Sequence, residues 1–153
     1  MDKQDERLKK SERLCSKKRI DLLFGTGGSH AMTAFPLKAV YRLTDSVPAS
    51  SSPDGDPETA SVQMMVSVPK RHFRRAVKRN RVKRQLREAY RKNKHSIVNK
   101  VNSLEGMSLM ITFIWMESKL YDSKTVEQKI KNLLQRIEEK VRHEKGREQT
   151  IQP

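Results

Sequence analysis

An alternation of apolar and polar residues predicts two strands in the first half of the chain. Apolar side chains occupy every second position from Phe35 to Tyr41, which is the period of a strand with one buried face. Pro36 indicates either an edge strand or the beginning of a strand, because proline has no amide hydrogen to donate. The second apolar run, SVQMMVSV, is followed by Pro69. We therefore expect strands at 35–42 and 61–68.

A third apolar run is nearly continuous. Residues 107–116, MSLMITFIWM, contain β-branched and aromatic side chains and almost no polar ones. A strand that is covered on both faces has this composition, because neither face needs polar groups for water. The run therefore predicts the central strand of the sheet.

Helical spacing occurs near both ends of the chain. In the N-terminal part, the apolar residues that could share a helical face are Leu14, Ile20, Leu23 and Phe24. This helix would begin near Arg13 and end at the glycine-rich residues 25–28. In the C-terminal part, apolar residues recur every three or four positions from Val126 to Val141. They predict a helix from Thr125 to Arg142, capped by Asp122 or Ser123, whose apolar face covers the sheet.

The segment between the last two strands is strongly basic. Residues 70–94 carry thirteen Lys or Arg residues and a single acid, Glu88. In a helix that begins at Ala76, the apolar stripe consists of Ala76, Val82, Leu86, Ala89 and Tyr90. The outward face consists of Asn80, Arg81, Arg84, Arg87 and Arg91. Basic neighbours at i,i+3 and i,i+4 oppose a helix, whereas a merely solvated face usually mixes acids with bases. We therefore expect this face to bind a polyanion.

Together these elements predict one α+β domain. A small central β-sheet is packed by helices, and the basic helix lies in a crossover connection between two strands. The domain is expected to span 13–142, between a flexible N-terminal tail at 1–12 and a frayed C-terminal tail at 143–153. The Ser- and Pro-rich residues 44–60 are expected to form a long flexible loop.

Composition narrows the classes of function. The 153 residues carry a formal net charge of +15, a sequence pI of about 10.2 and only 5% aromatic residues, which is typical of a nucleic-acid binder. Cys15 is the single cysteine, so no internal disulfide forms. No apolar run has the length of a signal peptide or a membrane span. We therefore expect a cytoplasmic protein that does not bind membranes.

The sequence from Ala76 to Ala89, AVKRNRVKRQLREA, resembles the arginine-asparagine-arginine signature of the bacterial ribonuclease P protein subunit, A-V-x-R-N-R-x-K-R-x-x-R-E. Every fixed position of the signature is matched. The segment RLCSKKRIDLLFGTGG is similar to the N-terminal helix of that family, with Phe24 at the second phenylalanine position and Ile20 at the first. A second departure is Arg74, which stands where many members have glycine.

The resemblance implies a protein that binds a large catalytic RNA and helps it to remove the 5′ leader from precursor tRNA. Catalysis would belong to the RNA subunit and its Mg²⁺ ions, so no catalytic or metal-binding residue and no protein partner is implied for this chain. The family also has a left-handed crossover at the basic helix, whereas crossovers are generally right-handed. The residues that would dock on the RNA are Arg79, Asn80, Arg81, Lys83, Arg84, Arg87 and Arg91.

The leader would bind in a cleft between the N-terminal helix and the sheet. Phe24 is assigned to this cleft by its motif position, and Phe35 and Tyr41 are added on strand periodicity alone. Stacking on aromatic rings tolerates any base. Each ring could instead be a core side chain, and Arg79 could have a structural role because it projects close to the apolar stripe.

Three other functions would account for part of the sequence. A generic or ribosomal-type RNA-binding protein would share the charge but has no reason to match the whole signature. A protein-only nuclease would need clustered carboxylates to hold divalent metal ions, whereas Asp21, Glu88, Glu117 and Asp122 are scattered. A membrane-surface helix would need an aromatic anchoring face that the basic segment lacks.

Overall fold

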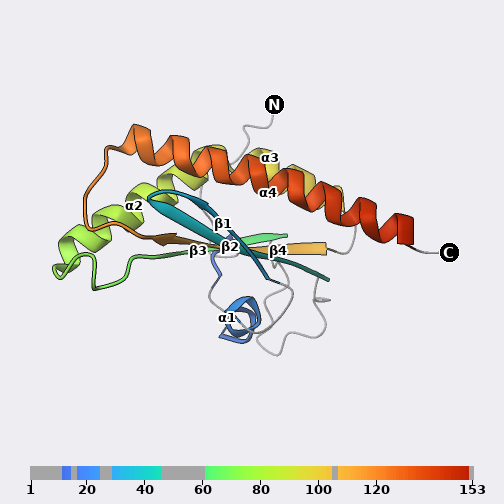
Figure 1. Ribbon diagram of the computed structural model, residues 1–153, viewed down its shortest axis with the longest axis horizontal. Helices are drawn as coiled ribbons and strands as arrows, with labels where there is room; N and C mark the ends of the chain where they lie inside the picture. The colour runs from blue at the N-terminus through green and yellow to red at the C-terminus, as the bar shows by residue number, and fades with distance from the viewer. Residues whose placement is uncertain (1–11, 15–16, 25–28, 46–60, 105–106, 152–153) are drawn as a thin grey trace.

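The computed structural model describes residues 12–14, 17–24, 29–45, 61–104 and 107–151. Four strands and four helices follow one another along these residues (Figure 1). In chain order they are α1 (Lys17–Phe24), β1 (His30–Ala34), β2 (Leu37–Asp45), β3 (Val62–Ser67), α2 (Ala76–Asn93), α3 (His95–Asn102), β4 (Met107–Trp115) and α4 (Ser123–Ile151). The α+β class predicted from the pattern is therefore confirmed.

The four strands form one mixed sheet in the order β1-β2-β4-β3. β4 lies inside the sheet, antiparallel to β2 and parallel to β3, as its continuous apolar run predicted. Seven of its nine residues are buried, from Ser108 to Phe113 and Trp115. The parallel pair β3 and β4 is joined through α2 and α3, which confirms the predicted crossover. The left-handedness of this crossover stays a prediction from the resemblance.

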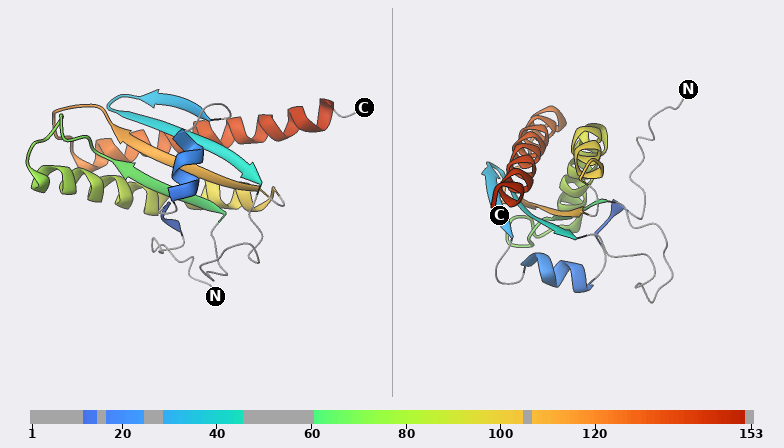
Figure 2. Two further views of the ribbon diagram at one scale, coloured as in Figure 1. Left: turned by 90° about the horizontal axis from the view of Figure 1, so that it is seen from below. Right: turned by 90° about the vertical axis from the view of Figure 1, so that its right-hand side faces the viewer.

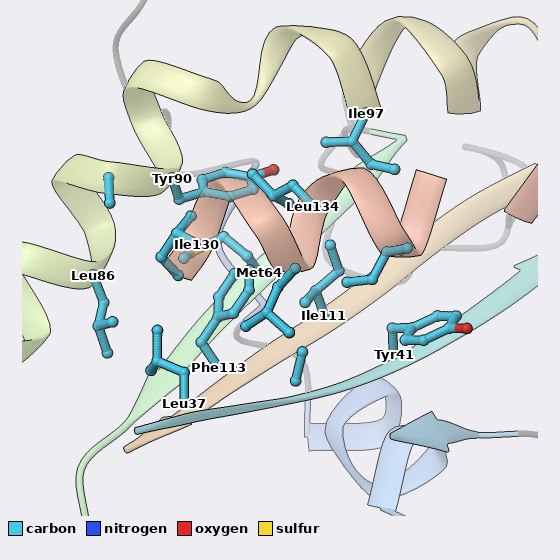
Figure 3. Packing of buried hydrophobic residues seen from close by; sticks show 14 of the residues in the cluster. Leu37, Tyr41, Met64, Leu86, Tyr90, Ile97, Ile111, Phe113, Ile130 and Leu134 are labelled. Atoms are coloured by element: carbon cyan, nitrogen blue, oxygen red, sulfur yellow. The ribbon is translucent and has the colours of Figure 1, made fainter. Parts of the chain in front are cut away.

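Helices α2, α3 and α4 lie together on one face of the sheet (Figure 1). The core lies between them and the strands: Leu86 and Tyr90 of α2, Ile130 and Leu134 of α4, and Phe113 of β4 are all buried there (Figure 3). α4 continues to Ile151, whereas we expected this helix to end at Arg142. Among the described residues, no helix is long and apolar enough to cross a membrane.

α1 lies on the opposite face of the sheet (Figure 2). Leu23 is fully buried there in a second, smaller cluster with Leu14 and Met110, against which Val40 and Met65 pack. An eight-residue helix is too short to be stable alone. Burial of Leu23 against the sheet therefore holds it in place.

Two elements of the structure were not predicted. β1 has only five residues, and its burial alternates weakly between exposed and half-buried, so it gives little apolar periodicity. α3 lies between the predicted basic helix and the predicted central strand, where we predicted no element. It is stabilised by only two buried residues one turn apart, Ile97 and Val101.

The turns also differ from the prediction at two places. Phe35 and Pro36 form the tight turn between β1 and β2, with a cis peptide bond between them, so the strand begins at Leu37. At its other end, β2 includes Thr44 and Asp45, which we assigned to the long loop. Residues 46–60 of that loop, and the glycine-rich residues 25–28, lie outside the described residues.

The folded domain includes Glu12, one residue earlier than predicted. Both carboxylate oxygens of Glu12 accept hydrogen bonds from the Nζ of Lys94, at 2.9 and 2.7 Å. The next residues lie beside β3: Arg13 forms a parallel bridge with Met64, and the amide of Leu14 donates to the Met64 carbonyl at 2.8 Å. The start of the domain is thus attached both to β3 and to the junction of α2 and α3.

Candidate nucleic-acid interface

The basic helix α2 is held by a narrow apolar stripe. Val82, Leu86, Ala89 and Tyr90 are buried, one or two residues per turn, as the helical projection predicted. Ala76, which we placed on the same stripe, is exposed. It lies in the first turn, where the helix begins, so the prediction is wrong at this position.

Polar contacts with the start of α4 fix the orientation of α2. Gln85 donates from Nε2 to the carbonyl of Tyr121 at 3.0 Å and to the hydroxyl of Ser123 at 3.2 Å. Near the other end of α2, the Nδ2 of Asn93 donates to the Oε1 of Glu127 in α4 at 3.3 Å. These contacts and the buried apolar stripe determine which side of α2 faces outward.

Four of the residues predicted to dock on RNA lie on this outward face. Asn80, Arg81, Arg84 and Arg87 are all exposed, and a helix places them within about 120° of one another. Among the described residues, none of these three arginines forms an ion pair or a hydrogen bond. Their guanidinium groups are therefore available for bidentate contacts with phosphates.

Arg91 differs from these residues because it is paired with the acid on this face. Its Nε donates to the Oε2 of Glu88 at 3.0 Å, and its Nη2 contacts Oε1 of the same carboxylate. The hydrogen bond from Arg91 lowers the pKa of Glu88, so this acid is ionised at neutral pH. Among the described residues, the arginines of the outward face that lack an acid partner are therefore Arg81, Arg84 and Arg87.

Arg79 has the structural role that the helical projection left open. It is half-buried, and its Nη1 donates to the carbonyls of Phe73 and Arg74, at 2.8 Å each. The guanidinium thereby ties the segment before α2 to the helix. Lys83 is also half-buried, so it lies at the border of the face rather than on it.

Additional cations surround the beginning of α2. Arg74, Arg75 and Lys78 are exposed there, and the helix has neither an acid in its first turn nor a side-chain N-cap. The positive end of a helix is stabilised by anions, so cations at this end are unfavourable unless a bound anion compensates them. Our list of docking residues omitted these three. The signal for them was the composition of residues 70–78 rather than helical periodicity.

The three aromatic residues predicted to bind the leader lie in different environments. Phe24, at the end of α1, is 51% exposed, and Phe35, in the turn between β1 and β2, is 54% exposed. Tyr41 is only 2% exposed and belongs to the core beneath the helices (Figure 3). Its ring therefore lies on the face of the sheet away from α1. The prediction for Tyr41 is wrong because alternation does not reveal which face the helices cover.

The described residues do not fit a metal site. No group of three or more His, Cys, Asp or Glu side chains among them is close enough to hold a metal ion. We therefore assign no step of a reaction to a metal held by these residues.

Sequence comparisons identify related proteins over most of the chain. A family model described as Ribonuclease P matches residues 8–138. The "Ribonuclease P protein component" of Porphyromonas gingivalis is 43% identical over 130 residues in strain ATCC 33277, covering 85% of each chain, and 42% identical in strain W83. A protein of the same name from Idiomarina loihiensis is 38% identical over 69 residues, covering 45% of this chain and 53% of its own.

A solved structure has a similar fold. The ribonuclease P protein from Thermotoga maritima superposes with a TM-score of 0.55 at 22% identity, covering 82% of this chain and 96% of its own. At this level of identity the likeness concerns the fold alone.

Proposed function

This chain belongs to the ribonuclease P protein family, and on that premise we propose that it binds the RNA subunit of ribonuclease P through the outward face of α2. The observation that carries the proposal is a set of exposed arginines that have no acid partner among the described residues, Arg81, Arg84 and Arg87. The exposed cations Arg74, Arg75 and Lys78 lie around the start of the same helix. A surface of this kind binds the phosphates of RNA, and its affinity comes largely from the release of counterions.

We further propose that the opposite face of the sheet, where α1 lies, receives the single-stranded 5′ leader of precursor tRNA. Phe24 supports this assignment because it is about half exposed, whereas Leu23 beside it is buried and anchors α1 to the sheet. A ring in this position can stack on a base of any identity. Phe35 stays a candidate on its exposure alone, whereas Tyr41 is buried in the core.

On this proposal the protein positions RNA and does not itself cleave it. Hydrolysis of the phosphodiester bond is assigned to the RNA subunit and the Mg²⁺ ions that it binds, as membership of the ribonuclease P protein family implies. Both the RNA subunit and precursor tRNA are partners in this scheme. The reaction would take place in the cytoplasm, where tRNA is processed.

The dependence of binding on salt tests the RNA-docking face. If about six phosphates are neutralised, the affinity for the RNA subunit falls on the order of a thousandfold between roughly 50 and 200 mM monovalent salt. Filter binding with the RNA subunit measures this slope. A flat response would contradict docking through the basic face.

Two further assays separate this proposal from the other functions. Purified protein without RNA should leave precursor tRNA intact, and cleavage by the protein alone would indicate a protein-only nuclease. A generic RNA-binding protein would bind an RNA duplex of equal length as tightly as the RNA subunit. We expect a clear preference for the RNA subunit and faster cleavage of precursor tRNA at low Mg²⁺ when the protein is added.

A further inference from the structure

One side chain on the outward face of α2 is not charged or polar. Val77 is 79% exposed, which makes it the most exposed of the large apolar residues in the described part of the chain. It lies in the first turn of α2, two residues after Arg75. A single exposed valine is common on protein surfaces, so its position among the other residues of the face decides whether it has a role.

Val77 lies in the middle of the docking face rather than beside it. In a helix its neighbours on the same side are Asn80 at i+3, Arg81 at i+4 and Arg84 at i+7, and all three are exposed. The buried residues Val82 and Leu86 lie on the opposite side of the helix. Any RNA that contacts Arg81 and Arg84 through its phosphates therefore also covers Val77.

A regular RNA helix offers no favourable partner to this side chain. The backbone of an A-form duplex presents phosphates and 2′-hydroxyls, and its major groove is too deep and narrow for side chains to enter. Covering Val77 with such a surface would remove water from the phosphates without burying apolar area. An unstacked nucleotide differs, because the face of its base is apolar and accessible.

We propose that Val77 packs against an unstacked base of the RNA subunit, so that the docking face selects an irregular RNA structure. The inference deepens the proposed function and rests on it, because it requires the RNA subunit to bind α2. The arginines supply affinity for any RNA of suitable charge, whereas Val77 supplies a contact that only a displaced base can make. It is a residue for specificity within a surface that otherwise binds phosphates.

The substitution Val77→Thr tests the contact with little effect on the fold. Threonine has nearly the shape of valine and is also branched at Cβ, so helix propensity changes little, but its hydroxyl group disfavours apolar packing. We expect roughly a threefold to tenfold loss of affinity for the RNA subunit, from the apolar area that is no longer buried. The salt slope should stay unchanged, because no charge is altered. Val77→Ile is the matched variant and should retain wild-type affinity.

A plain RNA duplex of equal length is the second ligand in this experiment. Val77→Thr should change its affinity less than about twofold, since the duplex presents no unstacked base. An equal loss for both RNAs, or no loss for either, would overturn the inference while leaving the salt-dependent docking intact. If the wild-type protein itself failed to prefer the RNA subunit over the duplex, the proposed function would be wrong.

Discussion

Arg84 and Arg91 belong to the same face of α2 but differ in their electrostatic surroundings. Arg84 is exposed and has no ion pair among the described residues, whereas Arg91 is half-buried and paired with Glu88. An arginine that already has a carboxylate gains less from a phosphate, because the first contact must be given up or shared. The arginines of this face are therefore not equivalent.

Arg84→Ala should weaken binding of the RNA subunit more than Arg91→Ala does. Loss of one phosphate contact lowers the salt slope by about one and the affinity by roughly fivefold to tenfold near 0.1 M salt. For Arg91→Ala we expect less than about a threefold change. Salt titrations of the two variants, with thermal unfolding to verify their folds, measure the difference. Equal losses would show that pairing with Glu88 does not restrain Arg91.

Glu88→Gln should increase the affinity for RNA. The substitution removes one negative charge from the face, so the electrostatic attraction to phosphates rises and the salt slope should become steeper by about one. The cost to the free energy of unfolding should be below about 0.5 kcal/mol, because the pair is partly exposed to solvent and its members are three residues apart. Weaker RNA binding by this variant would mean that Glu88 itself contacts the ligand.

The pKa of Glu88 also predicts a dependence on pH. Because Arg91 holds this pKa below its usual value, the ion pair is fully present at neutral pH and is lost as the pH falls through the lowered value. Acidification therefore produces the arrangement that Glu88→Gln has at every pH. Binding should become tighter at acidic pH in the wild-type protein but not in the variant, which a comparison of their pH profiles would measure.

For single residues, the sequence predicts the charged or apolar character of a surface better than the direction in which a side chain points. The charged and apolar sides of α2 follow from helical spacing, and the same projection placed Arg79 close to the apolar stripe, where it is now seen to bind two carbonyls. Tyr41 could not be oriented, because alternation divides a strand into two faces without saying which one the helices cover. The pairing of Arg91 with Glu88 follows from their i,i+3 spacing and could have been anticipated.

Among the elements, the junction between α2 and α3 is stabilised by charge from a distant part of the chain. Lys94 separates the two helices and is only 3% exposed, and its ammonium group is bound by both oxygens of Glu12. A buried charge is tolerated where it is paired and hydrogen-bonded. The segment before α1 therefore contributes to the position of the basic helix.

Glu12→Gln should destabilise the fold by on the order of 3 kcal/mol, since it removes the carboxylate that binds the buried ammonium group of Lys94. Glu139→Gln is the matched control: this acid is exposed on α4, and its loss should change the free energy of unfolding by less than about 0.5 kcal/mol. Urea denaturation of both variants measures the difference. Similar values for the two would show that the Glu12–Lys94 pair adds nothing to stability.

The elements that could be predicted are those with a strong pattern of their own. The continuous apolar run of β4 predicted a strand, and the three- and four-residue apolar spacing of α4 predicted a helix. The structure has both elements. β1 and α3 are short, and they are held by pairing with β2 and by packing against neighbouring elements rather than by local propensity. Their existence depends on tertiary contacts, which no short window of the sequence contains.

At the scale of the whole molecule, the sheet separates two surfaces. The helices α2, α3 and α4 cover one face, and α1 with Phe24 lies on the other (Figure 2). In the proposed function these surfaces bind different parts of the ribonuclease P complex. A substitution on one surface should therefore leave the function of the other intact.

Phe24→Ala and Arg84→Ala test this division of labour. Phe24→Ala should preserve binding of the RNA subunit and lower the preference of the holoenzyme for precursor over mature tRNA by about 1 to 3 kcal/mol, the value of one stacked base. Arg84→Ala should weaken binding of the RNA subunit. Once the complex is saturated with RNA, this variant should keep the wild-type preference for precursor tRNA. Affinities for both substrates, measured with each reconstituted variant, provide the comparison. Loss of both properties in either variant would contradict separate surfaces.

The bridge between Arg13 and Met64 has a practical consequence for handling the protein. β3 is an edge strand, and the backbone of Leu14 occupies part of its free edge. Truncation through Leu14 would uncover amide and carbonyl groups that can recruit the strand of another molecule. An affinity tag or fluorophore is therefore best attached ahead of Glu12, and a shortened version that begins after Leu14 should precipitate at concentrations where the longer one stays dissolved.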